Sequence, residues 1–230
     1  MTGETWILLR GLSREAGHFG PFVPALAGAM PDAAVVALDL PGAGSRLRDR
    51  WPDTIADAME MVRGKALSRV KTGAPMFLMG VSLGGMVVLE WAARHPSEVS
   101  GLVVGASSAT DVAPFWMRMR PQGLAALISS ALTSDPARRQ ARIVRAVSNR
   151  RDLWDATIRS WTQIDRERPV SVGTVRAQVA SASRWRAPRS LEVPALFLVG
   201  QGDRLVHPDC TRRRAVEWMF REGILSNPGG

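Results

Sequence analysis

The chain has 230 residues, of which 46% are hydrophobic and 22% are charged, and this length and composition fit one folded domain with a full core. No apolar run approaches the roughly 18 residues needed to cross a bilayer, and the first residues lack the pattern of a secretory signal. The single cysteine excludes an internal disulfide framework, so we expect a cytoplasmic protein without a membrane span.

The formal net charge of +9 is concentrated in one part of the chain. Between Phe115 and Ser190 the sequence has fifteen arginines and five carboxylates. Such a segment could attract an anionic substrate, a membrane surface or nucleic acid. Only two of the thirty basic residues are lysines, so an arginine-rich composition explains the excess equally well. No nucleic-acid-binding module accompanies the arginines, and we expect no nucleic-acid partner.

Apolar runs of strand length recur along the chain without alternating polar residues, and helical patterns lie between them. Strands that are covered by helices on both faces have this pattern. The sequence therefore predicts an α/β fold, a mostly parallel sheet flanked by helices. The expected strands are Trp6–Leu9, Ala34–Leu38, Met76–Met79, Leu102–Val104, Val193–Val199 and a weaker Ile224–Leu225. The expected helices are Ile55–Val70, Leu83–Arg94 and Asp209–Arg221.

Residues 112–185 interrupt this alternation, because their apolar spacing is helical throughout. Pro136 and Pro169 mark breaks, so we expect three or four helices here. We interpret 112–185 as a helical cap inserted into a single domain spanning 1–230. A cap over the strand ends would close a water-poor pocket. The pocket would be built from cap residues such as the following large apolar ones, whose inward or outward direction the sequence does not give: Trp116, Met117, Met119, Trp154 and Trp161.

The strongest chemical signal is a serine between glycines, Gly80-Val81-Ser82-Leu83-Gly84, which follows a predicted strand and precedes a predicted buried helix. Side chains at positions 80 and 84 would crowd the strand and helix that meet there, while the helix would aim free N–H groups at Ser82. A nucleophilic serine needs this setting, although a structural turn serine is the alternative.

Two further motifs follow strand ends. Asp203 lies in Gly200-Gln-Gly-Asp203, just after the predicted strand Val193–Val199, where a carboxylate could orient a catalytic base; capping of the next helix is the alternative. The segment Arg10-Gly11-Leu12 ends the first strand in a glycine turn.

Together these motifs resemble the α/β-hydrolase superfamily, specifically single-domain serine esterases with a helical cap. The resemblance implies Ser82 as nucleophile, the backbone N–H groups of Leu12 and Leu83 as the oxyanion hole, and Asp203 as the carboxylate of the triad. It implies hydrolysis of a small-molecule ester, thioester or related acyl bond through an acyl-enzyme, with no cofactor and no metal. Arg118 and Arg120 would favour the binding of a substrate that carries an acidic group.

The histidine of the triad is missing from its expected place after the last strand, where the chain reads Asn227-Pro-Gly-Gly230. His95 ends a helix and is expected to be a surface cap. His18 and His207 are the candidate substitute bases. Three explanations stay open, of which we favour the first: the domain is C-terminally truncated, it is a non-catalytic ligand-binding homologue, or it uses a relocated histidine.

Overall fold

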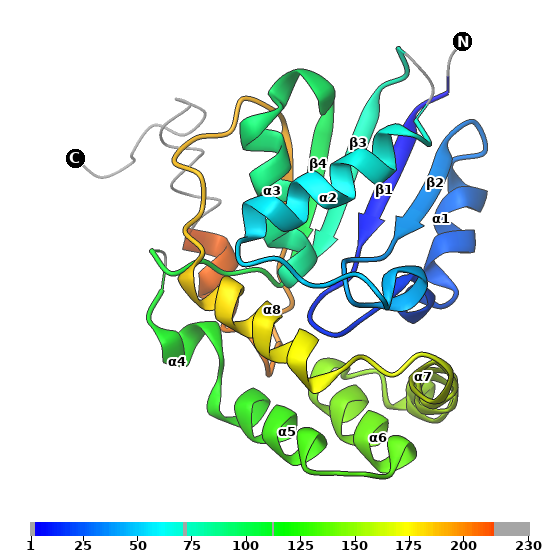
Figure 1. Ribbon diagram of the computed structural model, residues 1–230, viewed down its shortest axis with the longest axis vertical. Helices are drawn as coiled ribbons and strands as arrows, with labels where there is room; N and C mark the ends of the chain where they lie inside the picture. The colour runs from blue at the N-terminus through cyan, green and yellow to red at the C-terminus, as the bar shows by residue number, and fades with distance from the viewer. Residues whose placement is uncertain (1–2, 71–72, 112, 214–230) are drawn as a thin grey trace.

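A five-stranded parallel sheet forms the centre of the fold, in the strand order β2-β1-β3-β4-β5 (Figure 1). The computed structural model describes residues 3–70, 73–111 and 113–213. The predicted strand Ile224–Leu225 lies outside the described residues. The strands are β1 (Thr5–Leu9), β2 (Ala34–Leu38), β3 (Met76–Val81), β4 (Gly101–Gly105) and β5 (Ala195–Leu198). The predicted fold class, a parallel sheet flanked by helices, is confirmed.

The strand register determines which loops meet at the edge of the sheet. Leu9 of β1 lies opposite Gly80 of β3, and Gly80 lies opposite Val104 of β4. The carboxyl ends of these three strands are therefore level with one another. The loops that follow them leave the sheet side by side, as ligand sites of parallel sheets require.

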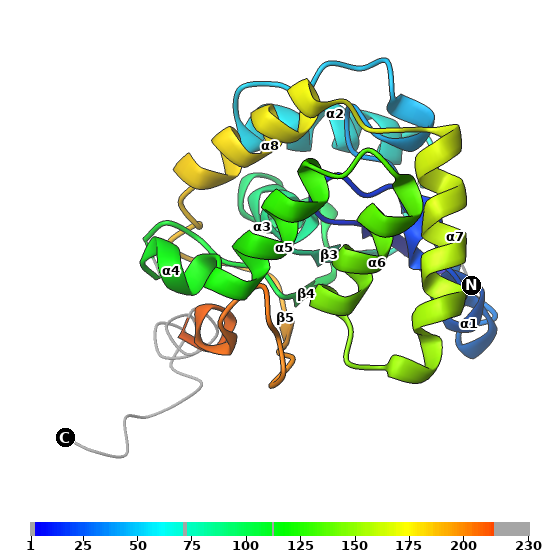
Figure 2. The same cartoon turned by 90° about the horizontal axis from the view of Figure 1, so that it is seen from below.

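Helices cover both faces of the sheet, with α2 (Ile55–Leu67) and α3 (Leu83–Arg94) on one face and α1 (Phe22–Ala29) on the other (Figures 1 and 2). The helix α3 has the predicted bounds and is buried along nearly its whole length, as its apolar sequence indicated. The helix α2 starts as predicted, where the Thr54 side chain accepts from the Asp57 amide, and it ends three residues before Val70. The helix α1 was not predicted.

Among the described residues between β4 and β5 there are five α-helices, against the predicted three or four. They are α4 (Phe115–Arg118), α5 (Pro121–Ala131), α6 (Pro136–Val147), α7 (Trp154–Glu167) and α8 (Val172–Arg184). The prediction was wrong because α4 is a single turn, and Pro121 starts a separate helix after it. These inserted helices lie beyond the carboxyl ends of the strands (Figures 1 and 2).

The apolar interior has two main parts. The larger cluster lies between the sheet, α2 and α3, and includes fully buried Trp91 and Met59. A smaller cluster joins α6 to α7 through Val144, Trp161 and Ile164. The inserted helices thus pack on one another, and α8 also contacts α3. No helix among residues 3–213 that the structure describes is long and apolar enough to span a bilayer.

Of the predicted helix Asp209–Arg221, only the first part falls within the described residues. Residues 208–213 are helical, and the remainder lies outside the described part of the chain. Thr211 of this segment donates a side-chain hydrogen bond of 3.0 Å to the carbonyl of Ser107, the second residue after Gly105. The segment is therefore anchored to the loop after β4.

Candidate active site

Ser82 occupies a strained backbone conformation between β3 and α3. Its φ of 56° and ψ of −116° lie where a residue with a side chain seldom goes, which costs about 1–3 kcal/mol. Neighbouring contacts hold it there: the Ser82 amide donates to the Gly105 carbonyl at 2.9 Å. The Ser107 hydroxyl donates to the Ser82 carbonyl at 3.1 Å. Hydrogen bonds from the β4 side thus fix the serine backbone.

The glycines beside Ser82 are required by close packing. A Cβ on Gly80 would lie 2.3 Å from the Gly84 carbonyl oxygen, and one on Gly84 would lie 2.6 Å from the Leu9 carbonyl oxygen. Atoms do not approach that closely without displacing backbone. These contacts bring the start of α3 directly against the ends of β1 and β3.

The loop after β1 passes next to the serine side chain. A Cβ on Gly11 would lie 3.1 Å from the Ser82 Cβ. The next residue, Leu12, lines the same cavity as Ser82 and Leu83. Within the described part of the chain, neither the Leu12 amide nor the Leu83 amide donates a hydrogen bond. Both residues predicted for the oxyanion hole therefore flank Ser82 with backbone donors that are available to a ligand.

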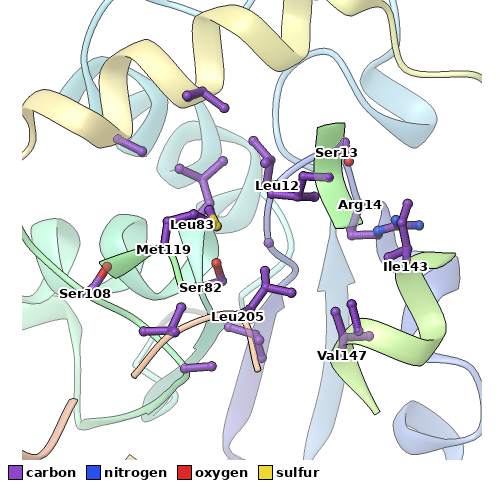
Figure 3. A pocket seen from close by; sticks show the side chains of 18 of the residues that line it. Leu12, Ser13, Arg14, Ser82, Leu83, Ser108, Met119, Ile143, Val147 and Leu205 are labelled. Carbon is purple, nitrogen blue, oxygen red and sulfur yellow. The ribbon is translucent and has the colours of Figure 1, made fainter. Parts of the chain in front are cut away.

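A cavity of about 340 Å³ lies over Ser82, between the strand ends and the inserted helices (Figure 3). Figure 3 shows Leu12, Leu83 and Leu205 around the serine, and Ile143 and Val147 farther along the wall. Most of this wall is apolar. A cavity of this size and character suits a short acyl chain or a small ring.

Two of the five large cap residues considered for the wall do line the cavity, namely Met119 and Trp161. Trp116 is 68% exposed to solvent. Trp154 packs against the cluster between α6 and α7, and Met117 packs on the cluster of Ala113, Val206 and Cys210. The direction of each side chain depends on how the inserted helices pack on one another.

Asp203 lines the same cavity as Ser82, on the loop after β5. One carboxylate oxygen, Oδ1, accepts from the Leu205 amide at 2.8 Å and from the Val206 amide at 3.0 Å. The Asp203 carbonyl accepts from the Arg120 guanidinium at 2.6 Å. Arg120 therefore holds the Asp203 loop and is not part of the cavity wall, whereas Arg118 lines it.

No histidine is among the described residues that line the cavity. The His18 ring is buried edge-on against Trp161, and its Nδ1 accepts from the Glu15 amide at 3.1 Å. His207 lies past Asp203, where its Nδ1 accepts from the Asp209 amide at 3.3 Å. His95 caps α3 and contacts Glu60 on the surface, as expected. The structure thus brings Asp203 to the cavity of Ser82 but leaves both candidate bases outside its wall.

Burial lowers the pKa of His18 to about 2, helped by the positive charges of Arg14 and Arg10. The ring stays neutral in the folded protein, while the unfolded chain takes up a proton below its pKa of about 6.5. The unfolded state therefore binds more protons, and stability falls as the pH drops through 6.5 toward 2. Between pH 7 and pH 4.5 this one group should remove roughly 2–3 kcal/mol of unfolding free energy.

The variant His18→Asn keeps a side-chain acceptor and removes the titration. Urea unfolding at pH 7 and pH 4.5 should therefore show a smaller acid loss in the variant than in the wild type. Other titrating groups are common to both proteins and cancel in the comparison. An identical acid loss would show that His18 is protonated in the folded protein.

Arg10 and Arg14 also line the cavity, and sequence reasoning assigned neither of them to the site. Arg10 was considered only for its place before the glycine turn. The one available signal was position: both residues lie just after the carboxyl end of β1, where parallel sheets carry their ligand sites.

The molecule is an α/β-hydrolase. Residues 4–221 match the family described as serine aminopeptidase, S33, and the chain belongs to that family. Among the described residues no three His, Cys, Asp or Glu side chains gather in a way that could hold a metal ion.

Relatives with described activities are found at moderate similarity. The chain is 26% identical over 215 residues to the biotin biosynthesis bifunctional protein BioHC of Teredinibacter turnerae, across 87% of this chain and 36% of that protein. It is 36% identical over 119 residues to the pimeloyl-[acyl-carrier protein] methyl ester esterase of Neisseria meningitidis serogroup B, across 52% of this chain and 41% of the esterase. The matches thus cover less than half of each relative's own length.

Among solved structures, the RedJ thioesterase of the prodiginine pathway in Streptomyces coelicolor has a similar fold. Its TM-score is 0.62 at 22% identity, and the match covers 93% of this chain and 73% of RedJ. At this identity the likeness concerns the fold alone.

Proposed function

We propose that the chain is a cytoplasmic serine hydrolase that cleaves an ester or thioester of a small acyl group through an acyl-enzyme on Ser82. The observation that carries this proposal is the strained Ser82 under a mostly apolar cavity, with the Leu12 and Leu83 amides beside it. The described esterase relative supports the ester class. The buried, unpaired Cys210 fits a reducing compartment. In this proposal residues 112–185 form the cap that closes the cavity.

In the first half of the reaction, the Ser82 Oγ bonds to the acyl carbon and the hydroxyl proton leaves to a general base. The Leu12 and Leu83 amides stabilise the oxyanion that develops on the carbonyl oxygen. The bond to the alcohol or thiol then breaks, and the leaving group takes the proton. In the second half, water attacks the acyl-enzyme, which releases the acid and restores the serine hydroxyl.

Asp203 would orient the base and stabilise its positive charge. His207 is the better candidate base in this chain, because it lies four residues after Asp203 and is partly exposed. His18 is the weaker candidate, because its ring is buried against Trp161 and its low pKa makes it a poor proton acceptor.

A fluorophosphonate ester tests this proposal, because it reacts with a serine whose hydroxyl is activated and leaves a stable adduct. We expect one adduct, on the peptide that contains Ser82, and none in Ser82→Ala. His207→Ala should slow the labelling if His207 is the base. His18→Ala in the same assay examines the other candidate.

A second candidate function is ligand binding without turnover. The absence of a histidine from the described wall of the cavity favours it. An unactivated serine hydroxyl is a poor nucleophile. A folded protein that binds short esters or acids in the cavity, yet forms no fluorophosphonate adduct, would support this function and contradict the first.

A further inference from the structure

The charged side chains that line the cavity are mostly cationic. Among the described residues of the wall there is one carboxylate, Asp203, and there are three arginines (Arg10, Arg14 and Arg118). A cavity whose wall is otherwise apolar strengthens the field of such charges, because low-dielectric walls screen them less than bulk water does. This excess of positive charge is not needed to stabilise an oxyanion, which the backbone amides already do.

The Arg10 guanidinium has aromatic neighbours and no anion. Its Cζ lies 5.1 Å from the centre of the Phe19 ring and 5.8 Å from that of Trp161. Its Nε is buried without a hydrogen-bond partner, and Arg10 makes no ion pair with any residue that the structure describes. Stacking on rings leaves the N–H groups in the guanidinium plane free, and that plane is the one in which a carboxylate binds.

Arg14 extends the same cationic surface. Its Cζ lies 4.7 Å from the centre of the Trp161 ring, and its Nη1 donates to the neutral Oε1 of Gln140 at 2.8 Å. Figure 3 shows Arg14 beside Ile143 at one part of the wall. Burial lowers the pKa of Arg10 to about 10 and that of Arg14 to about 9, so both remain charged at neutral pH.

The nearby carboxylates are already engaged by other arginines. Asp165 accepts from Arg139 and from Gln140, each at 3.0 Å. Glu15 forms a two-pronged ion pair with Arg168, with N–O distances of 2.9 and 2.7 Å. Within the described part of the chain, no carboxylate forms an ion pair with either Arg10 or Arg14.

We propose that Arg10 and Arg14 form an anion subsite of the cavity, which binds a carboxylate on the substrate while Ser82 attacks its ester or thioester carbonyl. The proposal rests on the proposed function for its reaction, and it names the substrate class as a carboxylate-bearing ester. The carboxylate could belong to the acyl part, as in a dicarboxylic monoester, or to the leaving group. The two sources share the recognition chemistry and are separated by experiment.

Turnover of three esters of similar length provides the first test. Mono(4-nitrophenyl) adipate carries its charge on the acyl part, 4-carboxyphenyl hexanoate on the leaving group, and 4-nitrophenyl hexanoate is neutral. For each ester, kcat/KM is divided by the rate of its uncatalysed hydrolysis. We expect this ratio to be at least about 10-fold higher for one of the charged esters than for the neutral ester. The ester that is preferred identifies the source of the carboxylate.

Arg10→Met removes the charge at nearly constant length and should abolish this preference. The matched control is Arg138→Met, because Arg138 carries the same charge on a side chain that is 81% exposed on α6, outside the cavity. The control should keep the preference. Arg14→Met provides a second variant if Arg10→Met does not fold. Equal preference in Arg10→Met, Arg14→Met and Arg138→Met would overturn the proposal.

Ligand binding separates failure of the subsite from failure of the hydrolase. Monomethyl adipate and dimethyl adipate differ in one charge, and their binding to the Ser82→Ala variant can be followed by calorimetry. We expect the monoanion to bind at least about 10-fold more tightly and to lose this advantage in Ser82→Ala/Arg10→Met. A protein without turnover that keeps this difference has an anion subsite and lacks the proposed hydrolysis. Equal binding of the two ligands would exclude the subsite whether or not the protein is an enzyme.

Discussion

Replacing Ser82 by alanine is expected to reduce hydrolysis of a short-chain nitrophenyl ester to the background rate, a loss on the order of 10³-fold or more. The proposed acyl-enzyme requires the Ser82 Oγ, and no other residue of the described cavity wall places a hydroxyl at the start of α3. Steady-state release of nitrophenol measures the effect. The loss should be in kcat, because the variant lacks the atom that forms the covalent bond.

Ser108→Ala is the matched control for this substitution, because Ser108 lines the same cavity but is not located at the strand–helix turn. We expect it to change kcat/KM by less than about 10-fold. Similar losses in both variants would indicate that any hydroxyl in the cavity matters equally, and would contradict the role of Ser82. Circular dichroism and thermal unfolding should show that both variants are folded.

Gly80→Ala is expected to have the largest effect on stability. The added Cβ would lie 2.3 Å from the Gly84 carbonyl oxygen and 2.7 Å from the Gly85 amide nitrogen, both of which belong to backbone. These close contacts can be relieved only if α3 moves away from β3, and the side chains of α3 are tightly packed there. We expect the free energy of unfolding to fall by about 3 kcal/mol or more.

Gly64→Ala is the control for a glycine that the fold does not require. Gly64 lies in the interior of α2, where an added Cβ would meet nothing within 4 Å. Alanine has the higher helix propensity, so this variant should be more stable than the wild type by about 0.5–1 kcal/mol. Urea denaturation of both variants measures the contrast, and a mild loss in Gly80→Ala would show that the turn can relax.

The strand–turn–helix around Ser82 could be predicted because it is local. The apolar run before Ser82, the glycines on either side of it and the apolar helix after it are consecutive in the chain. Their chemistry restricts the backbone without help from distant residues. The same holds for Asp203, whose place after a strand puts it at the carboxyl edge of a parallel sheet.

The inserted helices show where such reasoning ends. Their apolar residues repeat at helical spacing, which predicts helices but not what each apolar face will contact. Trp154 and Trp161 both belong to α7 and both pack in the cluster between α6 and α7, yet Trp161 also lines the cavity and Trp154 does not. The choice between these surroundings depends on how five helices pack together, which is a property of the whole layer.

The sequence by itself therefore determined the parallel α/β architecture, the strand–turn–helix around Ser82 and the position of Asp203 after a strand, because each depends on short-range patterns. Only the tertiary structure decided that Leu12 lies beside Ser82, that both candidate bases are outside the wall, and that Arg10 and Arg14 enter the cavity without an anionic partner. Those facts depend on the register of β1 with β3 and on contacts between residues more than a hundred positions apart, such as Arg14 with Gln140. The sequence does not show whether an arginine side chain will meet solvent, a carboxylate or the wall of a cavity in the folded protein.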